Sequence, residues 1–441
     1  MRKFEIRQVI AATALVFAIA LPLRAFADEW KLTLEQAVSR ALEENRDIAI
    51  ARERLEELEG MKGEARAMGL PQVAAVGSYQ RTWRKPQMII NGLPFRIGTN
   101  NNFVAGGQLS QLLWDGGRVF KAIKAARSEQ ARGIETIRDA EEQVRFQVKQ
   151  TFFQILYTDK VIDVLLKELG QLKSHLASIQ TRYSAGQDSD YTLMRQQVEV
   201  ANIEPQLIDA RRTRELLVGG IKILMAIPPA DGFVPTGGFD YHAKNLPAQE
   251  ELIGKAQTER PDLNAERLRV KSLEQNVGVE KAGWWPQLSF STSWQWQGYS
   301  DDLNVTANER TDSFTSGVAM TWPIFDGLKT ASRVKQARAR LMQQSYLASQ
   351  KQDEVAREAQ DARETLLRAR ETLQSQLKSF QLARRATAIA SERFESGLMS
   401  QLELNDTITS QARSEQLYLQ ATYDCLTAEA ALEKAVGGEI K

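Results

Sequence analysis

Four stretches of the chain contain no charged residue, and apolar positions alternate with polar ones along them: 71–80, 102–114, 284–297 and 313–325. The third is the clearest, because Leu288, Phe290 and Trp294 fall on one face while serine and glutamine fall on the other. A period of two residues is typical of a strand with one apolar and one polar face. We therefore predict strands over 71–82, 102–114, 285–297 and 313–325.

These strands are long, and tryptophan gathers around them. A tilted strand needs about 9–11 residues to cross a bilayer, whereas strands of soluble proteins are nearer 5–6. Every tryptophan except Trp30 lies in or beside the four stretches. Indole rings collect where an apolar band meets lipid headgroups. We therefore favour a membrane sheet over a soluble β-domain, with an aromatic belt of Trp83, Trp114, Trp284, Trp285, Trp294, Trp296 and Trp322.

Four strands cannot close on themselves, since the smallest membrane barrels use about eight. An open sheet edge in lipid would leave amide groups unpaired, at several kcal/mol each. The chain is therefore expected to form an oligomer. Strand number alone does not decide between two copies and three.

The rest of the chain has the apolar period of helices. No proline occurs from Asp115 to Arg182 or from Asp326 to Phe394, and both runs are rich in good helix formers. We predict helices over 115–183 and 326–394, each about 100 Å long. Helices over 190–225 and 400–436 follow them, and shorter helices at about 33–68 and 250–283 precede the strands.

The same order of elements occurs twice. Asn45-Arg46-Asp47-Ile48 corresponds to Arg260-Pro261-Asp262-Leu263, and Trp114-Asp115-Gly116 to Phe325-Asp326-Gly327. A repeat of this size fixes the architecture. We predict a first repeat over 28–225, a Pro- and Gly-rich surface linker over 226–248, and a second repeat over 249–441.

The N-terminus and the composition restrict the function. Residues 1–27 read as a cleaved secretory signal, with Arg2 and Lys3 before an apolar run and Ala25-Phe26-Ala27 at its end. A formal net charge of +1 gives no electrostatic reason to bind nucleic acid. His175, His242 and Cys425 lie far apart in sequence, so we expect neither a metal site nor a disulfide. We expect no cofactor and no catalysis.

The doubled set of motifs resembles the TolC-type outer-membrane efflux channel family, from about Leu32 to Val436. The resemblance rests on Pro71-Gln72 and Pro286-Gln287 at the strand starts, the aromatic-Asp-Gly strand exits, and two Arg-x-x-x-Gly hairpins. It implies a mixed α and β membrane protein, a homotrimer whose twelve-stranded outer-membrane β-barrel continues into a long periplasmic α-helical barrel. It also implies a passive exit duct of a tripartite efflux or type I secretion system, served by an inner-membrane pump and a periplasmic adaptor. Small molecules or polypeptides would be the cargo.

The resemblance also assigns a tip to the two hairpins. It places Arg182, Gly186, Arg393 and Gly397 where the adaptor would dock. Physically, Gly186 and Gly397 are placed to end the long helices in left-handed caps, and arginine can bond carbonyls at a helix end. Ser189 or Asp190, and Ser400, can cap the following helices.

The tip aperture of this family is often acidic, and the candidates here are Asp188, Asp190, Glu395, Glu403 and Asp406. Arg384 and Arg385 also lie nearby, so the charge selectivity stays open. The alternative function is a trimeric structural or adhesive stalk on a small barrel anchor. A stalk needs no helices that return to the membrane, whereas a duct does.

Overall fold

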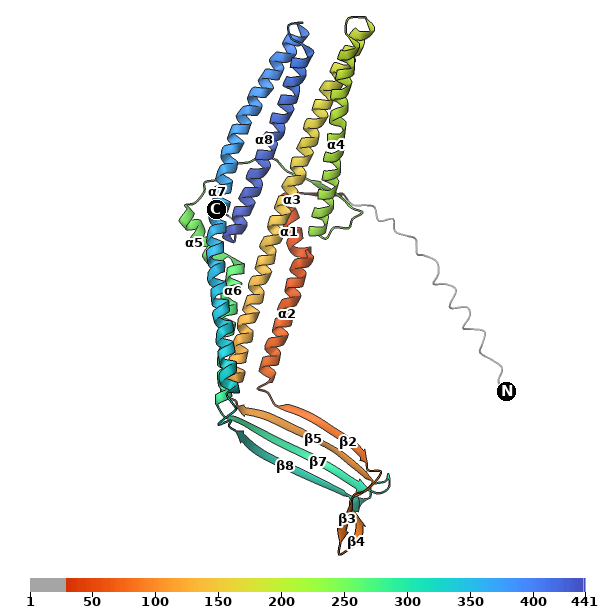
Figure 1. The fold of residues 1–441 in the computed structure, drawn as a ribbon, viewed down its shortest axis with the longest axis vertical. Coiled ribbons are helices and arrows are strands. Elements are labelled where there is room, and N and C mark those ends of the chain that lie inside the picture. The colour runs from red at the N-terminus through yellow and green to blue at the C-terminus, as the bar shows by residue number, and fades with distance from the viewer. Residues whose placement is uncertain (1–28, 439, 441) are drawn as a thin grey trace, which may run out of the picture.

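The computed structural model describes residues 29–438 and residue 440, so the expected signal segment 1–27 lies outside the described residues. The subunit is a long rod of helices with a β-sheet at one end and two helical hairpins at the other (Figure 1). The longest helices, α3 (Arg118–Ser184) and α7 (Lys329–Glu395), run from the sheet to the hairpins. Their partners in the hairpins are α4 (Asp190–Leu224) and α8 (Gln401–Val436).

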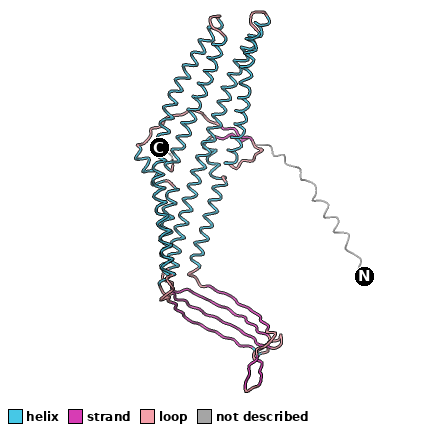
Figure 2. The backbone as a smooth tube through the Cα atoms, in the orientation of Figure 1, coloured by secondary structure: helices cyan, strands magenta, loops and turns pink. Residues whose placement is uncertain are grey.

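The largest sheet has four antiparallel strands in the order β2-β5-β7-β8. They are β2 (Gln72–Arg81), β5 (Asn101–Trp114), β7 (Gln287–Ser300) and β8 (Arg310–Thr321). Figure 2 shows these strands gathered at the end opposite the helical hairpins. Strand β8 ends four residues before Phe325, the expected boundary, and Pro323, which has no amide donor, follows closely.

Strand pairing groups the apolar side chains on one face of the sheet. Phe290 lies opposite Val318 and Trp294 opposite Phe314, so the apolar sets of β7 and β8 are neighbours. An irregularity between Leu112 and Trp114 shifts the register of β5, so that Trp114 rather than Leu113 lies opposite Leu288. A residue inserted at such a bulge reverses the facing of the residues after it. In a regular strand Leu113 would share the face of Leu109, and the bulge breaks that alternation.

The long helices bury one apolar stripe each. On α3 the buried stripe includes Val144, Val148, Phe152 and Ile155, spaced by three and four residues. It packs against α1 (Leu34–Glu44) and the mid-part of the molecule. On α7 Val355 and Ala359 are buried, whereas Tyr346 is exposed within one subunit.

Each shorter helical region is two helices rather than the single helix expected. The first breaks at Asn45 into α1 and α2 (Arg46–Ala67), and the second at Arg260 into α5 (Gln249–Glu259) and α6 (Pro261–Lys281). Asn45 caps α2, because its side chain accepts a hydrogen bond from the amide of Asp47. Pro261 starts α6 at the position where a helix tolerates proline best.

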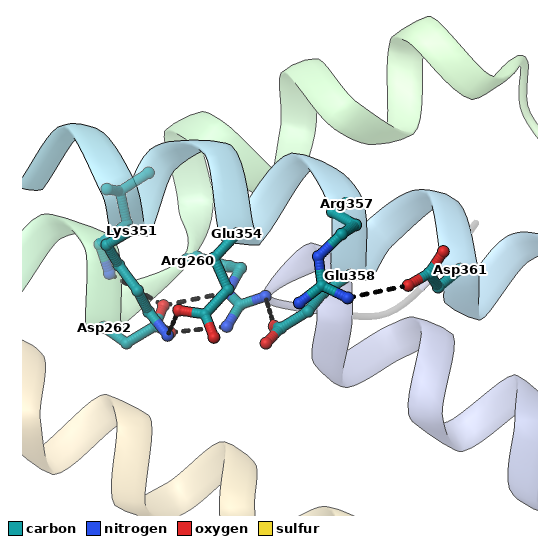
Figure 3. A network of polar contacts seen from close by, with 8 residues as sticks. Arg260, Asp262, Lys351, Glu354, Arg357, Glu358 and Asp361 are labelled. Atoms are coloured by element: carbon teal, nitrogen blue, oxygen red, sulfur yellow. Dashed lines mark hydrogen bonds and ion pairs between the residues drawn. The ribbon is translucent and has the colours of Figure 1, made fainter.

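A network of charged side chains holds the second break against α7 (Figure 3). The buried Arg260 guanidinium contacts Asp262 at 2.6 Å and Glu358 at 2.5 Å, and Lys351 reaches Asp262 at 3.1 Å. Burial opposes ionisation of Asp262, but hydrogen bonds and charge from Arg260 and Lys351 outweigh it and lower its pKa to about 2. The break between α1 and α2 is held by a neutral contact, because the Asn45 side-chain amide donates to the carbonyl of Leu224 at 2.9 Å.

Two small pieces of β-structure were not predicted. β1 (Glu29–Leu32) pairs in parallel with β6 (Gly232–Pro235), which lies inside the expected linker. Phe233 and Phe239 of that segment are buried, so it is not simply a surface linker. β3 (Gln87–Ile90) and β4 (Leu93–Arg96) form a hairpin beyond the distal end of the sheet, between β2 and β5.

Candidate functional site

The candidate site is the end of the molecule where the two helical hairpins turn (Figure 1). Helix α3 ends in a Schellman motif: the amide of Gly186 donates to the carbonyl of Tyr183, and that of Gln187 to Arg182. Helix α7 ends in the same way, with Gly397 donating to Phe394 and Leu398 to Arg393. The φ angles of Gly186 and Gly397 are 75° and 71°, a conformation that strains other residues.

A serine caps the N-terminus of each second hairpin helix, Ser189 for α4 and Ser400 for α8. The hydroxyl of Ser189 accepts from the amide of Thr192, and that of Ser400 from the amide of Glu403. Glu403 completes a capping box, because its carboxylate accepts from the backbone amide of Ser400. These hydrogen bonds lower the pKa of Glu403. The Glu403 carboxylate is therefore held against the start of α8.

Arg182 contacts an acidic and an aromatic side chain at the tip. Arg182 forms an ion pair with Asp188, with 3.0 Å between Nε and Oδ2. Its guanidinium also lies over the ring of Phe394, 5.5 Å from the centroid. Arg182 thus joins the first hairpin to α7. Arg393 lies in the last turn of α7, near the negative end of the helix dipole.

The acidic candidates occupy several environments. Asp190 is the first residue of α4 and Glu395 the last of α7. Asp406 lies on α8, where it lines a cavity of about 340 Å³ together with Arg195, Glu199 and Arg413. Two of the five, Asp188 and Glu403, are engaged in the local structure described above.

A buried amide cluster, which we did not predict, connects the two hairpins. Gln196 of α4 is fully buried and donates to the carbonyl of Leu172 on α3 at 3.0 Å. Its side-chain oxygen accepts from Gln401 and from Asn405 of α8, both at 2.8 Å. A glutamine in a helix usually reads as a solvated residue, and only the facing of α3, α4 and α8 reveals its role.

A buried carboxyl group lies on the hairpin formed by α3 and α4. Glu168 of α3 is only 5% exposed and belongs to the stretch of α3 that carries Leu165, Leu169 and Leu172. Burial, and secondarily the charge of Glu199, raise the pKa of Glu168 to about 7. This group therefore titrates near neutral pH.

Five of the seven tryptophans of the expected belt lie at the ends of the sheet, and the other two lie within a strand. Trp114, Trp284, Trp285 and Trp322 lie where the strands meet the helices, and the indole of Trp322 donates to the carbonyl of Trp284 at 3.2 Å. Trp83 follows the distal end of β2 and is stacked under Arg81. Trp294 and Trp296 lie within β7.

The described helices include none that is long and apolar enough to cross a membrane. Among the described residues there is also no group of three or more His, Cys, Asp and Glu side chains placed to hold a metal ion.

Relatives and solved structures agree with this architecture. The chain is 24% identical to the probable outer membrane lipoprotein SilC of Salmonella typhimurium, over 92% of the chain and 86% of the relative. It is also 24% identical to the solvent efflux pump outer membrane protein SrpC of Pseudomonas putida, over 92% and 85%. The structure resembles the outer membrane protein VceC of Vibrio cholerae, with a TM-score of 0.77, 18% identity, and coverage of 92% and 97%.

The CmeC outer membrane channel of Campylobacter jejuni is similar as well, with a TM-score of 0.77 and 20% identity, over 92% of the chain and 86% of that channel. The expected fold class is confirmed: a mixed α and β protein of the outer membrane, with four strands in the main sheet of each subunit. The profile of the family described as Outer membrane efflux protein matches residues 37–216 and 252–438. The chain belongs to the outer membrane efflux protein family.

Proposed function

We propose that the trimer is a passive exit duct that a periplasmic adaptor and an inner-membrane pump engage at the hairpin ends. The observation that carries the proposal is the placement of both glycine-ended hairpins at one end of helices about 100 Å long, with the sheet at the other. Both helix pairs return toward the sheet, as a duct requires and a stalk does not. Relatives named for solvent and toluene efflux favour small molecules over polypeptides as cargo.

The adaptor would dock on apolar side chains beside the tip. Tyr191, Met194 and Val198 are exposed on one stripe of α4, and Leu398 is exposed just after Gly397. Such a stripe at spacings of three and four residues suits an amphipathic helix as partner. Arg182, Gly186, Arg393 and Gly397 would shape this surface by fixing both turns.

Site-specific cross-linking tests the docking surface. A photoreactive residue at Met194 or Leu398 should capture the adaptor in cells, whereas the same residue at Ile208, exposed farther along α4, should not. Equal capture at Met194 and Ile208 would place the docking surface elsewhere.

The amide cluster around Gln196 would keep the tip closed in the resting channel. Gln196→Ala removes three hydrogen bonds, each contributing about 1 kcal/mol, and leaves buried amide groups unpaired. We expect this variant to conduct more ions than the wild type in planar bilayers. Gln197→Ala, at the exposed neighbouring position, is the control and should behave as wild type. An unchanged conductance in Gln196→Ala trimers would show that the cluster does not hold the tip closed.

A further inference from the structure

Strands β2 and β8 are the two edges of the sheet, and the outer edge of each pairs with no other strand among the described residues of the subunit. Every residue of β2 and of β8 is exposed, whereas most residues of β5 and β7 between them are partly buried. In the trimer, β8 of one subunit therefore meets β2 of the next. The internal repeat provides the register of that contact.

The repeat preserves strand register. The counterpart of a residue is the one at the matching position of the other repeat, in the alignment that matches Asn45 with Arg260 and Trp114 with Phe325. Replacing each residue by its counterpart turns the pair Gln72–Ser110 into Gln287–Thr321, and the pair Tyr79–Phe103 into Trp294–Phe314. Both pairs occur in the structure. The strand exits correspond too: Asp115 accepts from the amide of Val119, and Asp326 from the amide of Thr330.

The contact between β5 and β7 joins the second strand of one repeat to the first strand of the next repeat. The contact between β8 and the β2 strand of the next subunit likewise joins the second strand of one repeat to the first strand of another. Replacing the observed pairs by their counterparts turns Gly107–Trp294 into Val318–Tyr79, Phe103–Gly298 into Phe314–Trp83, and Asn101–Ser300 into Asp312–Lys85. We propose that Val318, Phe314 and Asp312 of each subunit lie opposite Tyr79, Trp83 and Lys85 of the partner subunit.

The chemistry of the paired residues agrees with this register. Within one subunit Tyr79 is 50% and Val318 62% exposed, and Trp83 is 84% and Phe314 72% exposed. The register covers one apolar side chain with another in both cases, and adjacent aromatic side chains stabilise antiparallel pairs. Lys85 forms an ion pair with Asp301 of its own subunit at 2.5 Å, and Asp312 would bring a second carboxylate beside this ammonium group.

The register also extends β2. The counterpart of Lys85 is Ser300, where β7 ends, whereas β2 stops at Arg81 in the single subunit. Pairing with β8 of the neighbour would continue β2 through residues 82–85. The base of the β3–β4 hairpin would then pair with the adjacent subunit.

Disulfide trapping tests the register. In the double variant Tyr79→Cys/Val318→Cys the two Cα atoms would lie about 4.5–5.5 Å apart across the seam, within disulfide range. Within one subunit they lie on opposite edges, and strand spacing alone separates them by at least about 14 Å, so a disulfide can form only between subunits. The native Cys425 is buried in α8, and each single variant serves as its control.

Mild oxidation should convert Tyr79→Cys/Val318→Cys into a covalent trimer on non-reducing gels. Trp83→Cys/Phe314→Cys samples the same register independently and should do the same. Tyr79→Cys/Met320→Cys and Tyr79→Cys/Ser316→Cys are displaced by two residues in either direction and should stay monomeric in sodium dodecyl sulfate. More efficient linkage of a displaced pair, or no linkage of either predicted pair in protein that amine cross-linking shows to be trimeric, would overturn the register.

Discussion

At the scale of single residues, the tip combines local signals with contacts that depend on distant segments. The glycine caps at Gly186 and Gly397 follow from sequence alone, because a helix end needs a residue that adopts positive φ. Gln196 and Glu168 are different. Their roles arise only when α3, α4 and α8 are packed together, and the sequence pattern does not say which helix face meets which neighbour.

Glu168 leads to a prediction about pH. Its pKa is about 7 in the folded protein, above the 4.5 of the free side chain, so the folded state binds more protons than the unfolded state between those values. The penalty for burying the charge is therefore absent at low pH and grows as pH rises to about 7. Glu168→Gln should stabilise the protein at pH 8 by on the order of 2 kcal/mol, and by much less at pH 5.

Thermal denaturation of detergent-solubilised trimers at pH 5 and pH 8 measures this difference. Glu204→Gln, on the exposed side of α4 in a surface pair with Lys173, is the matched control. A gain in Glu168→Gln that is the same at both pH values would contradict a buried, titrating carboxyl group.

At the scale of elements, the helix breaks were the main error of the sequence interpretation. The signals were present, since Asn45 is a good cap and Pro261 a good first residue, but the apolar period runs through both breaks. The pair β1–β6 could not be predicted, because two strands of four residues about two hundred positions apart carry no local pattern that links them. The four strands and the long helices were predictable, because each has a sustained period.

The ionic network at the second break leads to a prediction about stability. Arg260→Leu would leave Asp262 and Glu358 without their shared guanidinium, and breaking a buried pair costs about 3 kcal/mol. We expect a clearly lower dissociation temperature of the trimer. Arg357→Leu removes the exposed ion pair between Arg357 and Asp361, which lie one turn apart on α7 (Figure 3). This control should change the stability of the trimer by about 0.5 kcal/mol or less. Equal effects of the two changes would mean that the network is only a surface feature.

At the scale of the whole molecule, the sheet and the hairpins lie at opposite ends, and each repeat contributes two strands to the sheet and one helical hairpin. The strand pairing assigns Trp294 to the apolar face and Ser291, three residues earlier on β7, to the polar face. We infer that the apolar face contacts lipid and that the polar face lines the passage. That assignment was predictable from the alternation of β7, whereas the bulge in β5 was not, because one inserted residue has no signature in composition.

Trp294→Asp or Leu288→Asp should impair assembly, at about 2 kcal/mol per subunit for a charge on the lipid face. Ser291→Asp should assemble normally, because it adds the same charge on the other face of the same strand. The amount of heat-dissociable trimer in outer membranes is the measurement. Equal losses in all three variants would show that the two faces are wrongly assigned.

The β3–β4 hairpin occurs in only one of the two repeats, and this gives the ends of the assembled channel different symmetry. At the tip, six hairpins of nearly one design surround the axis, two from each subunit. At the far end, three projecting hairpins alternate with three short connections. A ligand approaching from outside the cell would encounter three equivalent β-hairpins, whereas a periplasmic partner would encounter six nearly equivalent helical hairpins.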